Sequence, residues 1–177
     1  MALLTKINYQ NSFHNLSPID IKSAETIMRN IANQQWKIEL HTKPKLRTYL
    51  RFKDTFETEK YVQFSKNRFE RSLLAQIRSG TLPLNIELGR FRNIEIENRI
   101  CTLCENNVIE DEFHFIMLCP AYDDCRSTMF HNIMSPDFTN LSLDDKFIHL
   151  MKNESKLVGK FLKAAWEIRK CKLFTTN

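Results

Sequence analysis

The sequence predicts a mainly α-helical protein with little strand, organised as small helical domains around a compact cysteine/histidine module. Helices are expected because apolar residues recur at helical spacing in several segments, which are bounded by capping residues, Gly or Pro. The module is expected because Cys and His residues gather between positions 101 and 119. With 177 residues, 42% of them apolar, the chain is long enough to bury a core.

Residues 1–42 are predicted to be an N-terminal segment that contains one helix. Ser17 is a suitable N-cap, and Pro18 suits the first helical position, where no amide donor is needed. The apolar face of this helix would consist of Ala24, Ile27, Met28 and Ile31. The pattern continues to Leu40, and Pro44 ends it.

Residues 43–99 are predicted to be a basic, mostly helical region. They carry thirteen Lys or Arg against seven Asp or Glu, a balance of +6, whereas the whole chain carries +5. Such an excess is typical of a surface that contacts a phosphate backbone. The alternative is an ordinary solvated surface, because charge alone does not identify a partner.

The basic region contains two segments of uncertain type and one clear helix. Residues 45–53 fit either a strand or a helix, and the pattern leaves this choice open. Residues 83–100 are predicted to be extended or broken, because apolar and polar residues alternate from position 84 to 88. Residues 64–78 show the period of an amphipathic helix.

In the helix predicted over 64–78, Ser65 is the expected cap, and Ser79 with Gly80 forms the end. Its apolar face would be formed by Phe69, Leu73, Leu74 and Ile77. Its solvent-facing cations would be Arg68, Arg71 and Arg78.

All candidate nucleic-acid contacts come from residues 43–92. Long cations would neutralise phosphates, and Tyr49 is the candidate for stacking on an unpaired base. The candidates are Arg47, Tyr49, Arg51, Arg68, Arg71, Arg78, Arg90 and Arg92. The acidic stretch from Glu105 to Asp124 is expected to repel phosphate unless it is turned away.

Residues 100–134 are predicted to form a metal-binding module. Cys101 and Cys104 make one close pair, and His114 and Cys119 make a second pair after nine intervening residues. Three thiolates and one imidazole are a tetrahedral ligand set that a structural zinc ion takes, so we expect one bound zinc. The pattern places His114 on a short helix and Cys119 just past its end.

The ligand set has one alternative. Cys125 lies six positions after Cys119 and could replace His114, which would give a four-cysteine site. Helical periodicity, however, turns Cys125 away from Cys119. Both sets predict a closed structural site, because a catalytic zinc keeps one coordination position open.

Residues 135–177 are predicted to be C-terminal helices with a packing role. Ser142 caps the first of them. Its inward side chains would be Leu143, Phe147, Leu150 and Met151. Those of the last helix would be Leu157, Phe161, Ala165 and Ile168.

No catalytic pattern is found in the sequence. Tyr122-Asp123-Asp124 lacks the residue that separates the aromatic from the two aspartates in the polymerase signature. The zinc-deaminase motifs are also absent. The sequence predicts an intracellular protein, nuclear or cytoplasmic, because it has five cysteines and no export signal. It predicts no membrane partner, because no apolar run approaches the roughly 20 residues needed to cross a bilayer.

A longer pattern of residues points to a family. It comprises Arg99-Ile-Cys-Thr-Leu-Cys, Ile109-Glu-Asp-Glu-Phe-His-Phe and Cys119-Pro-Ala-Tyr with Arg126, and upstream Lys45-Leu-Arg-Thr-Tyr, Arg78, Glu87 and Gly89-Arg90. This pattern, which covers residues 43–130, resembles the cysteine/histidine region downstream of the polymerase in reverse transcriptases of non-long-terminal-repeat (LINE-type) retrotransposons. The resemblance implies that Cys101, Cys104, His114 and Cys119 are metal ligands. Because the palm, fingers and endonuclease are missing, it implies a fragment or stand-alone derivative without polymerase activity.

The sequence therefore predicts a zinc-stabilised nucleic-acid-binding fragment without catalytic activity of its own. Its expected partners are RNA or DNA and, through the resemblance, the polymerase part of a retroelement. The alternative is a zinc-stabilised structural or protein-interaction domain whose cations are incidental. The salt dependence of binding separates the two, because phosphate contacts release counterions.

Overall fold

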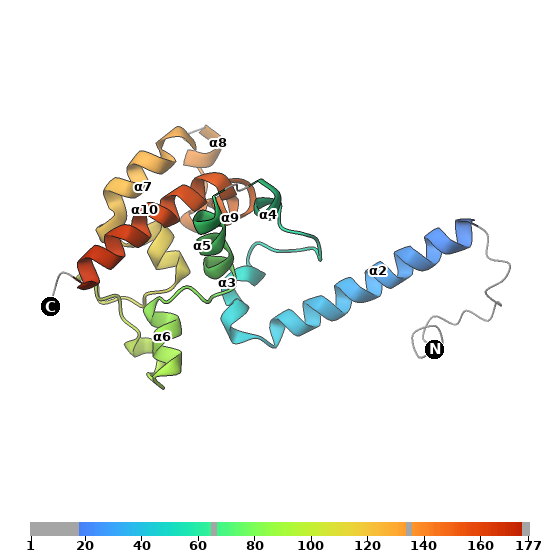
Figure 1. Ribbon diagram of the computed structural model, residues 1–177, viewed down its shortest axis with the longest axis horizontal. Helices are drawn as coiled ribbons and strands as arrows, with labels where there is room; N and C mark the ends of the chain where they lie inside the picture. Colours follow the sequence, from blue (N-terminus) through green and yellow to red (C-terminus); the bar gives the residue numbers. More distant parts are fainter. Residues whose placement is uncertain (1–17, 65–66, 134–135, 175–177) are drawn as a thin grey trace. The chain divides into compact units, whose positions relative to one another are not determined.

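The structure, a computed structural model, describes residues 18–64, 67–133 and 136–174 (Figure 1). The chain divides into two units, Met1–Glu39 and Leu40–Asn177. Within the described ranges the regular structure is helical, apart from one antiparallel bridge between Ile100 and Ile109. This confirms the predicted mainly α-helical fold with little strand. In the same ranges, no helix combines the length and the apolar character needed to cross a membrane.

Most of α2, Pro18–His41, belongs to the first unit, and the bounds of this helix agree with the predicted start and end. Its predicted apolar face is half-buried at Ala24 and Ile31 but exposed at Ile27 and Met28. Helical spacing therefore predicted the helix correctly, but only part of its predicted apolar face is shielded from solvent.

In its described residues the second unit consists of short helices and three longer ones, α5, α9 and α10. In chain order, all these helices are η2 Pro44–Leu46, α3 Arg47–Leu50, α4 Lys60–Phe64, α5 Arg68–Arg78, α6 Asn85–Phe91, η3 Ile96–Asn98, η4 His114–Leu118, η5 Pro120–Tyr122, α7 Asp123–Phe130, η6 His131–Ile133, α8 Pro136–Thr139, α9 Leu143–Asn153 and α10 Ser155–Phe174. The segments 43–99, 100–134 and 135–177 all lie in this unit.

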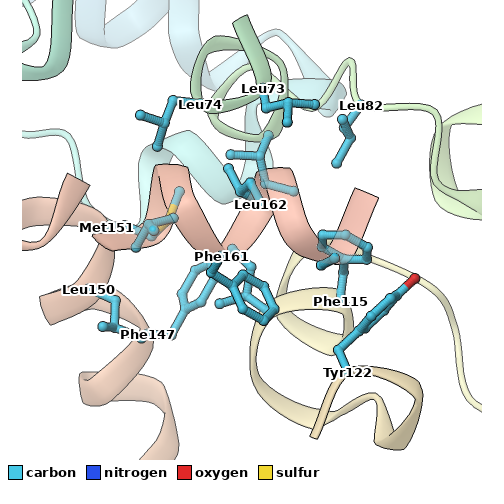
Figure 2. Close-up of a cluster of buried hydrophobic side chains, with 14 of the residues drawn as sticks. Leu73, Leu74, Leu82, Phe115, Tyr122, Phe147, Leu150, Met151, Phe161 and Leu162 are labelled. Carbon is cyan, nitrogen blue, oxygen red and sulfur yellow. The ribbon is translucent and has the colours of Figure 1, made fainter. Parts of the chain in front are cut away.

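The core of the second unit forms around α10, which packs against α4, α5, α7 and α9. Figure 2 shows Phe161 and Leu162 of α10 between Leu74 of α5 and Phe147 of α9. Phe115, which follows the metal-site histidine in sequence, joins the same core with its ring centroid 6.2 Å from that of Phe161. Each such buried side chain contributes about 1.5–3 kcal/mol. The cysteine/histidine segment therefore shares its core with α10.

Helix α5 differs from its predicted form at the N-terminus. The predicted cap, Ser65, lies outside the described residues, and the side chain of Asn67 accepts hydrogen bonds from the amides of Phe69 and Glu70 at 3.0 and 3.2 Å. Leu73, Leu74 and Ile77 are buried as predicted. The prediction that Phe69 belongs to the buried face is wrong, since 41% of its surface is exposed one residue after the helix begins.

The two segments of uncertain type are both helical in part. Residues 45–53 contain η2 and α3, which resolves the open choice in favour of helix. Of the two forms predicted for 83–100, extended or broken, the extended form is wrong, because the segment is broken into α6, Asn85–Phe91, and η3, Ile96–Asn98. The Glu110 carboxylate accepts a hydrogen bond from the first amide of α6, that of Asn85, at 2.8 Å. A cap that comes from a residue so far along the chain is not visible in the local pattern.

Gly80 ends α5 in a conformation that requires glycine. Its φ is +64°, and a Cβ at this position would lie 2.0 Å from the carbonyl oxygen of Lys45. We expect Gly80→Ala to lower the free energy of unfolding by about 1–3 kcal/mol through backbone strain, with the steric clash in addition. Urea unfolding measures it as a lower midpoint at unchanged slope. Ser72→Ala, on the exposed side of α5, is the control. Equal urea midpoints for both variants would contradict the conclusion that this position requires glycine.

Candidate metal centre

The four predicted ligands come together in the structure. One ligand atom from each of Cys101, Cys104, His114 and Cys119 lies within 4.8 Å of all the others. The Sγ atoms of Cys101 and Cys119 lie 3.9 Å apart, and the Cys104 Sγ lies 3.5 Å from His114 Nε2. The four residues are close enough to hold a metal ion.

These distances can be compared with those of a tetrahedral site. Metal–sulfur bonds of about 2.3 Å at tetrahedral angles place two sulfurs about 3.8 Å apart, and a metal–nitrogen bond of about 2.0 Å places sulfur and nitrogen about 3.5 Å apart. The observed separations, 3.9 and 3.5 Å, match both edges. A disulfide would need a sulfur–sulfur distance near 2.05 Å, and the cysteines are free.

A short reversal of the chain carries the first pair of ligands. The amide of Cys101 donates to the carbonyl of Val108 at 2.8 Å, and the amide of Glu110 donates to that of Arg99 at 2.9 Å. Asn107 has a φ of +50° and reverses the chain between these bonds. Asn tolerates this left-handed region better than most residues, so the sequence favours the turn.

The second pair of ligands is positioned by η4, a π-helical turn. The Asp111 carboxylate accepts a hydrogen bond from the amide of His114 at 2.7 Å at the start of the turn. Cys119 is extended and follows the end of the turn, and its amide donates to the carbonyl of His114 at 2.8 Å. The predicted arrangement, with His114 on a short helix and Cys119 just past it, is confirmed.

Arg126 closes the end of this turn. Its Nε donates to the carbonyl of Ile116 at 2.8 Å, and its Nη2 donates to that of Cys119 at 2.9 Å. Carbonyls at a helix end lack intrahelical donors, so a cation that reaches them fixes the position of the last ligand.

Cys125 does not belong to the cluster. It is buried in α7, with its Sγ 4.0 Å from the carbonyl oxygen of Phe161. The four-residue group that could hold a metal includes His114 and leaves Cys125 out. The structure thus favours the Cys/Cys/His/Cys set over the four-cysteine alternative.

A buried ion pair lies beside the first ligand. Glu110 and Arg169 are 0% and 2% exposed and form a two-point salt bridge, with Arg169 Nη2 donating to Glu110 Oε2 at 3.0 Å. The Sγ of Cys101 lies 3.7 Å from Glu110 Oε1, and the amide of Asn85 donates to Glu110 Oε2. One carboxylate therefore joins α6, α10 and the metal-site turn.

Glu112 is the second buried acid of this stretch. Its carboxylate accepts hydrogen bonds from Arg47 at 2.7 Å and from the hydroxyl of Thr48 at 2.8 Å. Burial raises the pKa of Glu112, and the charge of Arg47 opposes that effect. Within the acidic stretch, which is expected to repel phosphate unless it is turned away, Glu110 and Glu112 are therefore buried and paired with arginines.

The contact between Cys101 and Cys119 makes the two thiols unequal. The hydrogen bond to Cys119, together with burial, raises the pKa of Cys101 to about 12. The same hydrogen bond lowers the pKa of Cys119, and burial opposes it. Cys119 is therefore the thiol of this pair that ionises first, and the thiolate is the form that binds a metal.

Arg78 does not lie on an exposed cationic face, and that prediction is wrong. It is 5% exposed, with its guanidinium 4.3 Å from the ring centroid of Phe52 and 5.3 Å from that of Tyr61. It donates to Glu59 at 2.7 Å and to the carbonyl of Met151 at 2.6 Å. Sequence periodicity missed this because the counter-charge and the rings come from other segments.

Tyr49 is also engaged within the fold. Its hydroxyl donates to Glu59 at 2.8 Å, and its ring packs edge-on against Phe52 with 5.5 Å between centroids. Burial, followed by the hydrogen bond to Glu59, raises the pKa of Tyr49. The ring is half-buried, which reduces the surface it offers to a base.

The remaining candidate cations lie nearer to solvent. Arg51 pairs with Asp144, and Arg90 donates to Glu87 at 2.7 Å. Arg71 is half-buried, whereas Arg68 and Arg92 are exposed. The predicted contacts thus range from the buried Arg78 to the exposed Arg68, Arg90 and Arg92.

Sequence reasoning missed Arg169. The signal was present, because Arg169 follows Phe161 and Ala165 at four-residue intervals and so continues the buried stripe of α10. An arginine on an apolar stripe indicates a buried partner, since an unpaired charge there is costly.

The fold and the cluster define a small helical domain built around a three-cysteine, one-histidine site suited to a metal. No family model, curated protein or solved structure matches the chain. The resemblance to the LINE-type region rests on the motif residues alone.

Proposed function

We propose that the cluster binds one zinc ion as a structural cofactor. The observation that carries this proposal is the tetrahedral spacing of three thiols and one imidazole. Thiolates favour zinc over magnesium or calcium, which prefer oxygen ligands. A bound zinc would cross-link the Cys101–Cys104 turn to His114 and Cys119, and four protein ligands leave no position for a substrate.

We further propose that the domain binds RNA or DNA and has no catalytic activity of its own. The support is the formal charge of +5, the exposed cations and the resemblance to a region that acts beside a polymerase. The partner would be a phosphate backbone, read with little sequence selectivity because long cations contact phosphate rather than base edges.

A protein-interaction domain is the second candidate. It is favoured by exposed apolar side chains at the end of α6 and in η3, since Phe91 and Ile96 are 69% and 55% exposed. Binding to a protein through such a surface would change little with salt, whereas phosphate binding would weaken steeply. A salt series therefore distinguishes the two candidates.

Purified protein is expected to contain one zinc per chain. The Cys101→Ser, Cys104→Ser double variant should lose it, because two of the four ligands are removed. His114→Ala should weaken zinc binding more than Cys125→Ala, since Cys125 lies outside the cluster. Elemental analysis and competition with a chromophoric chelator measure both. Full zinc content in the double variant would contradict the site.

A further inference from the structure

Five of the thirteen cations of residues 43–99 form salt bridges within the protein. Salt bridges join Arg47 to Glu112, Arg51 to Asp144, Lys53 to Glu59, Arg78 to Glu59 and Arg90 to Glu87. Two of the paired acids, Glu112 and Asp144, come from outside the region, so these pairs lower its balance from +6 to +4. The exposed cations outside these pairs, Lys43, Lys45, Lys60, Arg68 and Arg92, come from separate segments, whereas one later helix carries a row of three.

Helix α10 carries six Lys or Arg against one Glu. Arg169 is buried against Glu110, and Lys170 pairs with Glu167 at 2.8 Å. Lys156, Lys160 and Lys163 are exposed, and no ion pair involves them within the described part of the chain.

These three lysines lie on one face of the helix. Their spacing of four and three residues places them along one line, opposite the side that is buried in the core. The buried side consists of Val158, Phe161, Leu162 and Ala165. We name the exposed side, Lys156 with Lys160 and Lys163, the lysine face.

The dimensions of the lysine face suit a nucleic-acid strand. At 1.5 Å per residue, its seven-residue span covers about 10 Å, which is the rise of about three successive phosphates of one strand. The helix is anchored on the core on its other side, so the lysines are presented on a fixed support (Figures 1 and 2).

We infer that the lysine face of α10 is the main phosphate-contacting surface of the nucleic-acid-binding function proposed above, on which this inference rests. A nucleic acid is favoured over an acidic protein because the large apolar side chains of this stretch of α10 are buried or half-buried. Protein interfaces are depleted of Lys and have apolar or aromatic side chains at their centres.

The test compares two variants that lose the same charge. One replaces Lys156, Lys160 and Lys163 with Gln. The control replaces Lys60, Arg68 and Arg92, three exposed cations of the basic region, with Gln. Fluorescence anisotropy measures binding of the zinc-loaded proteins to a labelled single-stranded RNA and to a duplex DNA of the same length across a salt series. Circular dichroism confirms that both variants fold.

The lysine-face variant should bind about tenfold or more weakly at 0.1 M salt, with the salt slope reduced by about 2, as expected for three lost phosphate contacts. The control should stay within about threefold of wild type. If the wild type binds and only the control variant loses affinity, the inference is overturned and the proposed function stands. No binding of the wild type to either nucleic acid would overturn both, and binding to polyglutamate instead would assign the face to an acidic protein.

Discussion

Removal of the metal by a chelator is expected to unfold residues 100–134 and to destabilise α10 with them. A structural zinc site of this type contributes about 10–16 kcal/mol of apparent binding free energy, which the folded state loses when the chelator removes the metal. The effect spreads because Phe115 and Tyr122, with ring centroids 4.7 Å apart, belong to the core that Phe161 of α10 completes.

The measurement is a loss of helical circular dichroism and a gain of protease cleavage after chelation, both reversed by added zinc. Cys125→Ala provides the control, since it keeps the four ligands and should respond to the chelator in the same way. Unchanged dichroism and protease resistance after complete removal of the metal would show that the cluster does not stabilise the fold.

Arg169→Ala is expected to lower the free energy of unfolding by about 3–5 kcal/mol, because it leaves the Glu110 carboxylate buried without its counter-charge. The neighbouring Lys170 supplies a matched control on the same helix. Its salt bridge with Glu167 is exposed, so Lys170→Ala should cost about 1 kcal/mol or less. Urea unfolding of the zinc-loaded proteins measures both.

A double variant separates the ion pair from simple loss of packing. Arg169→Met with Glu110→Gln removes both charges and keeps similar volumes, so it should recover much of the stability that the single variant Arg169→Met loses by leaving the Glu110 charge unpaired. The amide of Gln can still accept the hydrogen bond from Asn85. Equal losses in the single and double variants would mean that packing, not the buried charge, explains the effect.

Local spacing was sufficient to predict the metal ligands but not the environment of the cations. Cys101, Cys104, His114 and Cys119 lie close in sequence, and short-range turns bring them together. The burial of Arg78, in contrast, depends on Glu59 and on rings from another segment. A helical period shows where an arginine lies on its own helix, but it does not show which distant acid will pair with it.

Distant partners, which a local pattern does not show, also explain why α6 and the burial of two acids were not predicted. The cap of α6 comes from Glu110, which is 25 positions away from Asn85. Residues that look acidic and exposed in sequence are buried because arginines from α3 and α10 reach them. Ion pairs between distant segments therefore neutralise charges in the basic region and in the acidic stretch, and the local pattern does not show these pairs.

The contacts of Glu110 also bear on whether the candidate metal site could be transferred to another protein. The side chain next to the first candidate ligand, Glu110, is completed by the amide of Asn85 in α6 and the guanidinium of Arg169 in α10. A transplanted 100–120 segment would carry an unpartnered buried carboxylate into its new host. We therefore expect a substitution at position 110 to be tolerated only with a matching substitution at position 169. The sequence of the metal site and that of the last helix would then have to change together.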